Sequence, residues 1–182
     1  MLNHLSQAVL DFWFGTGAER GKSHKRWFEK DPAFDAEIRT RFLVLYEELS
    51  ASGAWLDPGP ACLARIVVLD QFPRNMFRGM PRAFAADPLA LAAAKHAVAQ
   101  GYDRGLLPVE RTFVYLPFEH SESLADQEKA LELFTDHDNH KWAVKHWEII
   151  KRFGRFPHRN AILGRESTPE EIAFLREPGS SF

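Results

Sequence analysis

A short motif that could bind an anion occurs twice in this sequence. Residues 71–75 read Gln-Phe-Pro-Arg-Asn, residues 155–160 read Arg-Phe-Pro-His-Arg-Asn, and a glycine follows each copy, at Gly79 and Gly164. An arginine offers a planar fork of N–H donors that matches a carboxylate or phosphate, and an asparagine amide both donates and accepts. The repeat therefore predicts two related structural units and, as a hypothesis, a binding site for a small anionic molecule or a peptide carboxylate.

Seven residues in and beside the two copies make up the predicted ligand-binding set. They are Asp70, Arg74, Asn75, Arg155, His158, Arg159 and Asn160. Asp70 falls on the apolar face of a predicted helix and in its last turn, where the helix dipole disfavours a negative charge. Such a carboxylate requires a cationic partner, and the local candidate is Arg74. A pair with Arg155 or Arg159 would instead join the two copies.

The same residues also admit a purely structural interpretation. Buried networks of Asp, Arg and Asn lock helices together, and breaking one is costly without any ligand. Pro73 and Pro157 should each end the preceding helix and push the phenylalanine before them out of helical geometry. A stiff loop would then aim each Arg-Asn pair, whether the pair binds a ligand or serves as a polar lock.

Histidines and carboxylates in the second half of the chain allow an enzymatic alternative. His146 falls on the apolar face of its predicted helix, where it is either a satisfied core residue or a general acid or base oriented by a carboxylate. Candidate carboxylates lie in residues 118–122, Phe-Glu-His-Ser-Glu, which should form a turn because Pro117 interrupts the helix before them. A small hydrolase or transferase would use His120, Glu122 and His146.

The enzymatic alternative has little further support. Adjacent residues of one turn rarely form a Ser-His-Glu triad, and the sequence has no Gly-x-Ser-x-Gly elbow. A non-enzymatic binding module is therefore favoured over an enzyme. A third hypothesis is a structural adaptor, in which an apolar face of the first helix docks a partner or a second copy in a homodimer. That face would consist of Leu5, Val9, Phe12 and Trp13.

Metals, cofactors and nucleic acids are not expected as ligands. Residues 137–140 read His-Asp-Asn-His, but they lie between two predicted helices, where Asp136, Asp138 or Asn139 is better suited to cap the next helix. His-Glu-x-x-His, Glu-x-x-His and glycine-rich phosphate loops are absent from the sequence. The net charge of −2 argues against general nucleic-acid binding, although the basic, aromatic stretch 142–165 could stack single-stranded bases.

Charge is sorted along the second half of the chain. Residues 117–138 are strongly acidic, and residues 141–165 are strongly basic. Two helices that pair opposite faces would explain this pattern, and so would a basic concavity for an anionic ligand.

The elements that must position these residues are predicted to be helices throughout. They cover residues 3–14, 32–52, 59–71, 88–100, 108–116, 124–137, 140–153 and 169–176, with a helical turn near 23–30. Four cap-like residues precede a proline, as is typical of helix starts: Asp31, Asp57, Asp87 and Thr168. Thr168 and Glu171 suit a capping box. Gly53, Gly101 and Gly154 are placed to end helices in left-handed caps.

We expect a single all-α domain over residues 1–182, in which about eight helices stack as antiparallel hairpins in a tetratricopeptide-like arrangement. Aromatic residues make up 13% of the 182 residues, which is enough for a core without a metal or disulfide. The one cysteine, Cys62, excludes an internal disulfide and fits the cytoplasm. Residues 1–17 are too short an apolar run, and one broken by Asp11, for a signal peptide or membrane span.

Five motifs, in order, resemble the bacterial domain-of-unknown-function family 924. They are residues 10–14, 26–28, 69–75, 117–122 and 152–160, and the resemblance extends from about Leu10 to Leu175. It implies an all-α fold similar to tetratricopeptide-type helical hairpins. It implies no activity and assigns no catalytic or ligand-binding residue.

Overall fold

The computed structural model describes residues 2–181, and every regular element in that range is a helix, which confirms the all-α class. The chain divides into two compact units, each described here by itself. Unit 1 comprises Met1–Arg78 and Arg82–Pro117, and unit 2 comprises Gly79–Pro81 and Phe118–Phe182. The single domain and the tetratricopeptide-like stacking stay predictions.

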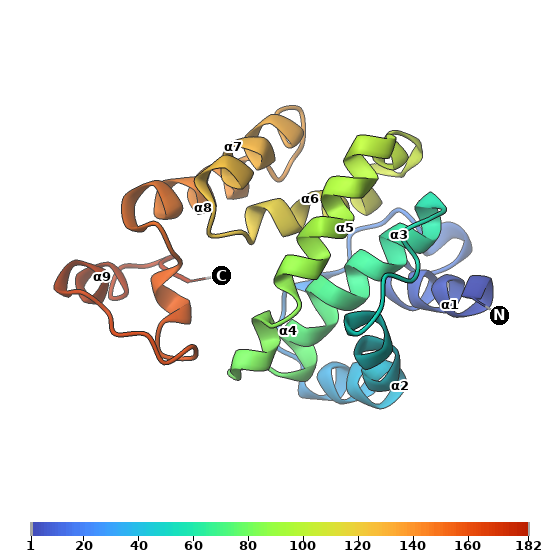
Figure 1. The fold of residues 1–182 in the computed structure, drawn as a ribbon, viewed down its shortest axis with the longest axis horizontal. Helices are drawn as coiled ribbons and strands as arrows, with labels where there is room; N and C mark the ends of the chain where they lie inside the picture. Colours follow the sequence, from blue (N-terminus) through green and yellow to red (C-terminus); the bar gives the residue numbers. More distant parts are fainter. Residues whose placement is uncertain (1, 182) are drawn as a thin grey trace. The chain divides into compact units, whose positions relative to one another are not determined.

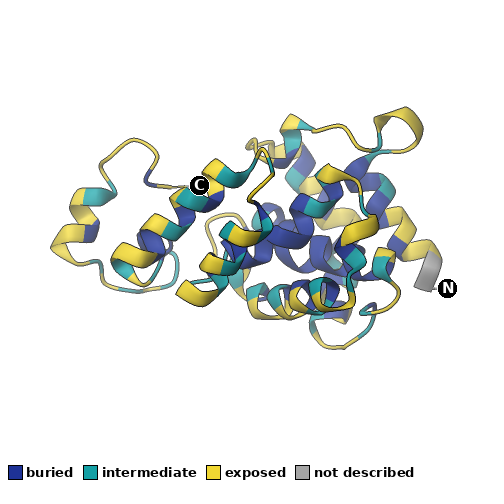
Figure 2. Ribbon diagram, turned by 90° about the horizontal axis from the view of Figure 1, so that it is seen from above, coloured by how far each residue is buried: buried dark blue, intermediate teal, exposed yellow. Residues whose placement is uncertain are grey.

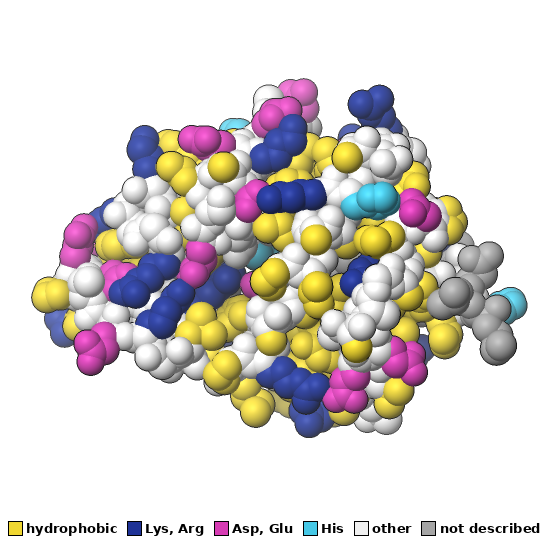
Figure 3. Space-filling view, viewed as in Figure 1, with side chains coloured by type: hydrophobic (Ala, Val, Ile, Leu, Met, Phe, Trp, Pro, Cys, Tyr) yellow, Lys and Arg dark blue, Asp and Glu magenta, His cyan; other side chains and the backbone are white. Residues whose placement is uncertain are grey.

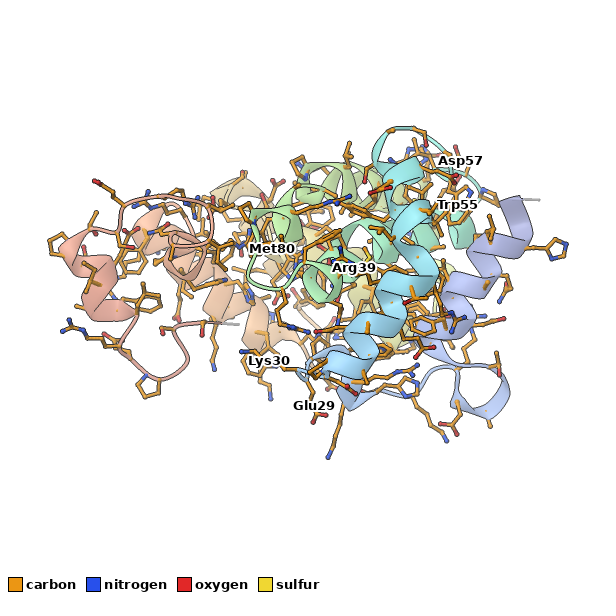
Figure 4. The ribbon with its side chains drawn as sticks, turned by 90° about the horizontal axis from the view of Figure 1, so that it is seen from below. Glu29, Lys30, Arg39, Trp55, Asp57 and Met80 are labelled. Carbon is orange, nitrogen blue, oxygen red and sulfur yellow. The ribbon has the colours of Figure 1, made fainter. Side chains whose placement is uncertain are left out.

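Unit 1 is built around one long, interrupted helix. Its helices are α1 (Leu2–Phe14), α2 (Pro32–Ser50), α3 (Gly59–Ile66), α4 (Phe72–Met76), α5 (Asp87–Gln100) and α6 (Pro108–Glu119). α3 lies between α1 and α5, and α2 packs against α4 (Figure 1). Arg39 of α2 donates a hydrogen bond of 3.1 Å to the carbonyl of Met76 at the end of α4 (Figure 4).

Aromatic side chains fill the core of unit 1. The Trp13 ring stacks on Trp27 and on Phe34, with centroids 6.0 Å apart in both pairs, and meets Phe72 and Phe113 edge-on. The inward faces of the helices are buried accordingly (Figure 2). Edge-on and offset contacts of this kind add to the stability gained from burial alone.

The docking face proposed for the first helix is wrong. Val9 and Trp13 are fully buried and Phe12 is 9% exposed, so these side chains belong to the core of unit 1. Only Leu5 of that set is exposed, at 52%. Helical periodicity identifies an apolar face of this helix, but most of that face packs against the core of the same chain.

The helix predicted to end at residue 71 continues through the first motif copy. A π-helical turn, Val67–Gln71, follows α3, and α4 follows directly; Phe72 is helical, with φ −59° and ψ −39°. The Phe72 N–H donates to the carbonyl of Val67, five residues earlier. This wider turn gives room for Pro73, which has no N–H and would clash with a carbonyl in a regular helix. The first copy is therefore helical, contrary to the predicted loop.

The second motif copy has the predicted geometry. Gly154 ends its helix in the left-handed conformation, with φ 69°, and Phe156 before Pro157 is extended, with φ −88° and ψ 107°. A short 3₁₀ turn, Pro157–Arg159, follows. A stiff turn thus presents this copy, whereas a helix presents the other.

Several predicted caps are confirmed. The Asp31 carboxylate accepts hydrogen bonds from the N–H groups of Ala33 and Phe34, and Thr168 forms a capping box with Glu171. Gly101 ends α5 with φ 71°.

Other predicted helix ends are wrong. α2 ends at Ser50 with a right-handed cap at Ala51, so Gly53 has no part in it. Pro58 rather than Asp57 precedes α3. Asp57, in the loop that also carries Trp55 (Figure 4), instead accepts hydrogen bonds from Tyr102 and His96. Asp87 is the first residue of α5 rather than its cap.

Pro117 also lies inside a helix instead of ending one. Only Phe118 and Glu119 follow it in α6, so the lost backbone hydrogen bond affects a terminal turn, where it is tolerated. This places Glu119 on a helix rather than in the predicted turn.

Unit 2 contains α7 (Leu124–Leu133), α8 (His140–Phe153) and α9 (Pro169–Phe174). α7 packs against α8 (Figure 1), and it ends four residues before the predicted boundary at 137. Ile149, Ile150 and Phe156 form a buried cluster, against which Phe153 and Phe174 pack. A search of residues 2–181 finds no helix that combines the length and apolar character needed to cross a membrane.

Candidate functional site

The arginine of the first motif copy is bound by carboxylates of its own unit. Arg74 Nη1 donates to the backbone carbonyl of Asp70 at 2.5 Å and to Asp87 Oδ1 at 2.9 Å, and Nη2 donates to Asp87 Oδ2 at 3.1 Å. The Asp70 carboxylate lies 3.4 Å from Nη1 and is buried, which confirms the predicted Asp70–Arg74 pair. Burial disfavours the charged guanidinium, but Asp70 and Asp87 outweigh it and hold the pKa of Arg74 above its usual value.

The asparagine of the first copy is engaged in the same way. Asn75 Nδ2 donates to Asp35 Oδ1 at 2.7 Å, and Arg78 binds the same carboxylate through two hydrogen bonds of 2.9 Å. Asp35 lies in the first turn of α2, so this network joins α2 to α4.

In the second copy, Arg155 and Asn160 share one carboxylate. Arg155 donates to Glu171 Oε1 at 2.7 Å and to Oε2 at 2.8 Å, and Asn160 Nδ2 donates to Oε2 at 3.2 Å. Glu171 is 2% exposed and also accepts the backbone N–H of Thr168. The hydrogen bond from Arg155 above all lowers the pKa of Glu171 to about 2, although burial opposes this.

Four of the seven predicted ligand residues therefore hold carboxylates within their own unit. They are Arg74, Asn75, Arg155 and Asn160. This geometry is that of a polar lock. In unit 2 the lock joins Arg155 and Asn160 to Glu171 of α9. A pair that joins Asp70 to Arg155 or Arg159 stays a prediction.

The remaining motif residues, His158 and Arg159, lie around the buried Phe156 ring together with His146. The Arg159 guanidinium carbon is 4.5 Å from the centre of the Phe156 ring. The His146 and His158 rings are each 5.6 Å from it, centre to centre. His120 extends the group, with its ring centre 6.3 Å from that of His146. Unit 2 thus gathers one arginine and three histidines in a small volume.

His146 is oriented by Glu119, one of the candidate carboxylates of the segment 118–122. Its Nδ1 lies 2.9 Å from Glu119 Oε1 and 2.9 Å from the carbonyl of Trp142. Two acceptors at Nδ1 favour a proton there, which leaves Nε2 as the acceptor of a neutral ring. Glu119 is 2% exposed, and its Oε2 is a buried oxygen that has no hydrogen-bond partner in residues 2–181. The carboxylate beside His146 is thus Glu119, at the end of α6, rather than the Glu122 chosen for the predicted enzyme.

Glu122 has a different role from the one proposed for the enzyme. It accepts hydrogen bonds from Arg165 at 2.7 and 2.9 Å and from the Phe156 N–H at 2.8 Å. Burial raises the pKa of Glu122, but these donors outweigh it and lower the pKa overall. Ser121 donates to Asp126 at 2.9 Å. The structure therefore brings His120 and His146 together, while Glu122 and Ser121 bind other groups.

The sequence matches the family model described as bacterial protein of unknown function (DUF924) over residues 9–179. The chain belongs to this family. It is also similar to the solved structure of a protein of unknown function from Agrobacterium tumefaciens, with 39% sequence identity and a TM-score of 0.86. That likeness covers 97% of this chain and 99% of the other. No curated protein matches the sequence. The resemblance to family 924 is confirmed, and it brings no activity with it.

Metal ligands are not grouped in the part of this family member that the structure describes. Among residues 2–181, no three His, Cys, Asp or Glu side chains are placed so that they could hold a metal ion. In the segment 137–140, His137 Nδ1 accepts the Asn139 N–H, and α8 begins after Asn139 without a side-chain cap. The capping role proposed for this segment's Asp and Asn side chains is therefore wrong.

His158 should make the stability of this DUF924 protein depend on pH. Burial, and then the charges of Arg159 and His146, lower the pKa of His158 to about 4 from an ordinary value of 6.5. The unfolded chain binds a proton at higher pH than the folded one, so stability is complete above about pH 6.5 and falls towards pH 4. We expect His158→Gln to remove up to about 3 kcal/mol of this variation.

Urea denaturation of wild type and variant between these pH values measures the effect. The titration of Glu171 lies lower, between its ordinary pKa of 4.5 and its folded value of about 2, so the two contributions separate. An unchanged slope of stability against pH in His158→Gln would rule out His158 as the cause.

Proposed function

We propose that this chain is a binding module for a small molecule that carries a phosphate or carboxylate group. The binding residues are His146, His158 and Arg159, which lie around Phe156 in unit 2, and His120, whose ring lies beside that of His146. The observation that carries this proposal is the concentration of cationic and protonatable side chains about one buried aromatic ring. Each of these side chains already has interactions within the protein, and the ligand would add to them.

The neighbouring carboxylates support this choice of site. Glu122 binds Arg165, Glu171 binds Arg155, and Glu119 lies against His146, so each of these carboxylates already has a partner other than Arg159. His158 is uncharged at neutral pH. An anion would therefore be held by the charge of Arg159 together with hydrogen bonds from the imidazole N–H groups. Charge-assisted hydrogen bonds contribute roughly 1.5–3 kcal/mol each, so a few of them are sufficient for micromolar affinity.

The arginines and the asparagine that bind Glu171 and Glu122 hold the segment that carries Arg159 in place. Arg155 and Asn160 fasten the segment that carries Arg159 to Glu171, and Arg165 fastens it to Glu122. A binding arginine on a fixed segment loses less conformational entropy when the ligand arrives, which favours affinity.

A thermal-shift screen against phosphates and carboxylates tests the proposal. A ligand at about one hundred times its Kd adds roughly 2.7 kcal/mol of stability, or about 5–10 °C in Tm for a chain of this size. We expect this rise in wild type and in the control Arg176→Gln, which alters an exposed arginine of the same unit. Arg159→Gln should lose it while still melting cooperatively.

An equal rise in Arg159→Gln would contradict the site. If Arg159→Gln does not fold, Arg159→Lys keeps the charge but not the planar fork, and it should bind at least about tenfold more weakly. Wild-type affinity in the lysine variant would likewise contradict the role of Arg159.

A second candidate function, a small hydrolase or transferase, is favoured by the Glu119–His146 pair. A buried carboxylate 2.9 Å from Nδ1 is an arrangement that orients a histidine as a general base. The enzyme would then use Glu119 in place of Glu122, with His120 beside it. A screen of esters, phosphoesters and amides should show turnover that His146→Asn abolishes, and the absence of turnover above background would reject this candidate.

A further inference from the structure

The outer surface of α8 carries lysines that contact aromatic rings rather than carboxylates. Lys145 Nζ lies 4.5 Å and Lys141 Nζ 5.7 Å from the centre of the Trp142 ring, and Lys151 Nζ lies 4.3 Å from that of Trp147. All three lysines are exposed, and within residues 2–181 none of them takes part in an ion pair. Trp142 itself is 41% exposed, so the basic surface has an aromatic centre.

The neighbouring helix α7 carries the opposite charge. Glu128 and Glu132 of α7 lie four residues apart and are exposed, as is Asp136 in the turn after the helix. Leu124, one turn before Glu128, is 42% exposed. Glu132 pairs with Lys129 of the same helix at 2.8 Å. α7 and α8 pack together, yet among the described residues Lys141, Lys145 and Lys151 form no ion pair with the carboxylates of α7. The sorted charges therefore pair at Glu122 and Arg165, 2.7 Å apart, but the exposed lysines of α8 do not take part in this pairing.

We propose that the α7–α8 hairpin pairs with the same hairpin of a second copy of this chain. Around a two-fold axis, the lysines of each α8 would face the carboxylates of the other copy's α7. Lys141 and Lys145 are one helical turn apart, as are Glu128 and Glu132, so the two rows match in spacing. Two antiparallel hairpins paired in this way form a four-helix bundle, and a two-fold contact uses the same surface twice.

Charge complementarity selects a second copy over other occupants. A nucleic acid or an acidic peptide on α8 would lie beside the carboxylates of α7 and be repelled by them. Figure 3 shows one face of the molecule, on which basic and acidic side chains are interspersed. A second copy of the hairpin presents both charges, so that its carboxylates can lie opposite the lysines of the first copy and its lysines opposite the carboxylates.

The chemistry of the surface predicts how such a dimer behaves. Exposed ion pairs are weak and screened by salt, so burial of Trp142 and Leu124 has to supply much of the affinity. We therefore expect a dimer that weakens as salt is raised from about 0.05 M to about 0.5 M. Of the residues proposed for the anion site, His146 lies on α8, but it is buried, whereas the lysines of this surface are exposed.

Sedimentation equilibrium of the full chain, with charge-reversal variants, tests the dimer. Wild type at low salt should have twice the chain mass. Lys141→Glu with Lys145→Glu should be monomeric, as should Glu128→Lys with Glu132→Lys, and an equimolar mixture of the two variants should form a heterodimer. Lys25→Glu with Lys30→Glu changes the charge equally on exposed residues of unit 1 (Lys30 is labelled in Figure 4) and should leave the dimer intact.

Three results would overturn the proposal. They are a wild type that stays monomeric at low salt, a dimer that survives both reversals, and a mixture that fails to associate although each variant folds by circular dichroism. If a reversal variant fails to fold, Trp142→Ala tests the same surface without a change in charge. It should raise the dimer Kd at least about tenfold, and an unchanged Kd would contradict the interface.

Discussion

Replacing Arg74 by methionine is expected to lower the free energy of unfolding by about 3–4 kcal/mol. The substitution removes the cation that lies 3.4 Å from the buried Asp70 carboxylate and that binds Asp87 through two hydrogen bonds. Methionine keeps most of the side-chain volume, so the loss reports the charge and its hydrogen bonds rather than a cavity. Urea denaturation at neutral pH measures it.

Arg78→Met is the matched control for this prediction. Arg78 also binds an aspartate, Asp35, through two hydrogen bonds, but its side chain is 38% exposed. Exposed pairs contribute about 0–1 kcal/mol, so this variant should lose far less stability. Equal losses in the two variants would show that burial of Asp70 has no special cost, and the lock in unit 1 would have to be reconsidered.

Replacing Glu171 by glutamine is expected to cost about 2–3 kcal/mol at neutral pH. Arg155 and Asn160 both donate to this carboxylate, and a neutral amide offers them one acceptor oxygen in place of two. The cost stays below that of a fully buried pair because Arg155 is partly exposed. Glu170→Gln is the control: Glu170 pairs with Arg152 at the surface, so its loss should stay within about 0.5 kcal/mol.

The dependence on pH identifies the charge as the cause. The pKa of Glu171 is lowered from 4.5 to about 2 in the folded chain, so its contribution is complete above about pH 4.5 and is lost as the pH falls towards 2. The difference between wild type and Glu171→Gln should shrink over the same range. A difference that does not vary with pH would point to side-chain shape instead.

The two locks bear on function because they fix the segments that carry the motif. In unit 2 the chain from Arg155 to Arg165 has little regular structure, yet carboxylates from α9 and from the segment after α6 hold it at both ends. Arg159 lies between these fastenings. We expect Glu171→Gln to weaken anion binding as well as stability, whereas Arg159→Gln should affect binding selectively.

Local rules predicted much of the fold. The caps at Asp31, Thr168, Gly101 and Gly154 depend on a few neighbouring residues, and all four are confirmed. The pairing of Asp70 with Arg74 followed from the cost of a buried carboxylate at a helix end, and these residues are also close in sequence.

The wrong predictions share one physical cause: they depend on tertiary contacts and helix geometry that local sequence patterns do not specify. Pro73 and Pro117 were expected to end helices, but a π-helical turn accommodates the first and a terminal position accommodates the second. Glu119 and Glu171 find their partners across long stretches of chain, and no local pattern specifies such a pairing. Periodicity finds an apolar face, but it does not say what covers that face.

The most direct measurement is an NMR titration of the imidazole ¹⁵N signals with a phosphate or carboxylate compound selected by the thermal-shift screen. The chain has eight histidines; His146 and His158 lie against Phe156, and His120 lies beside His146. We expect the signals of His120, His146 and His158 to shift together and to saturate at the Kd found by melting, while the other histidines stay unchanged. Shifts confined to those other histidines, namely His4, His24, His96, His137 and His140, would place the ligand elsewhere and contradict the proposed site.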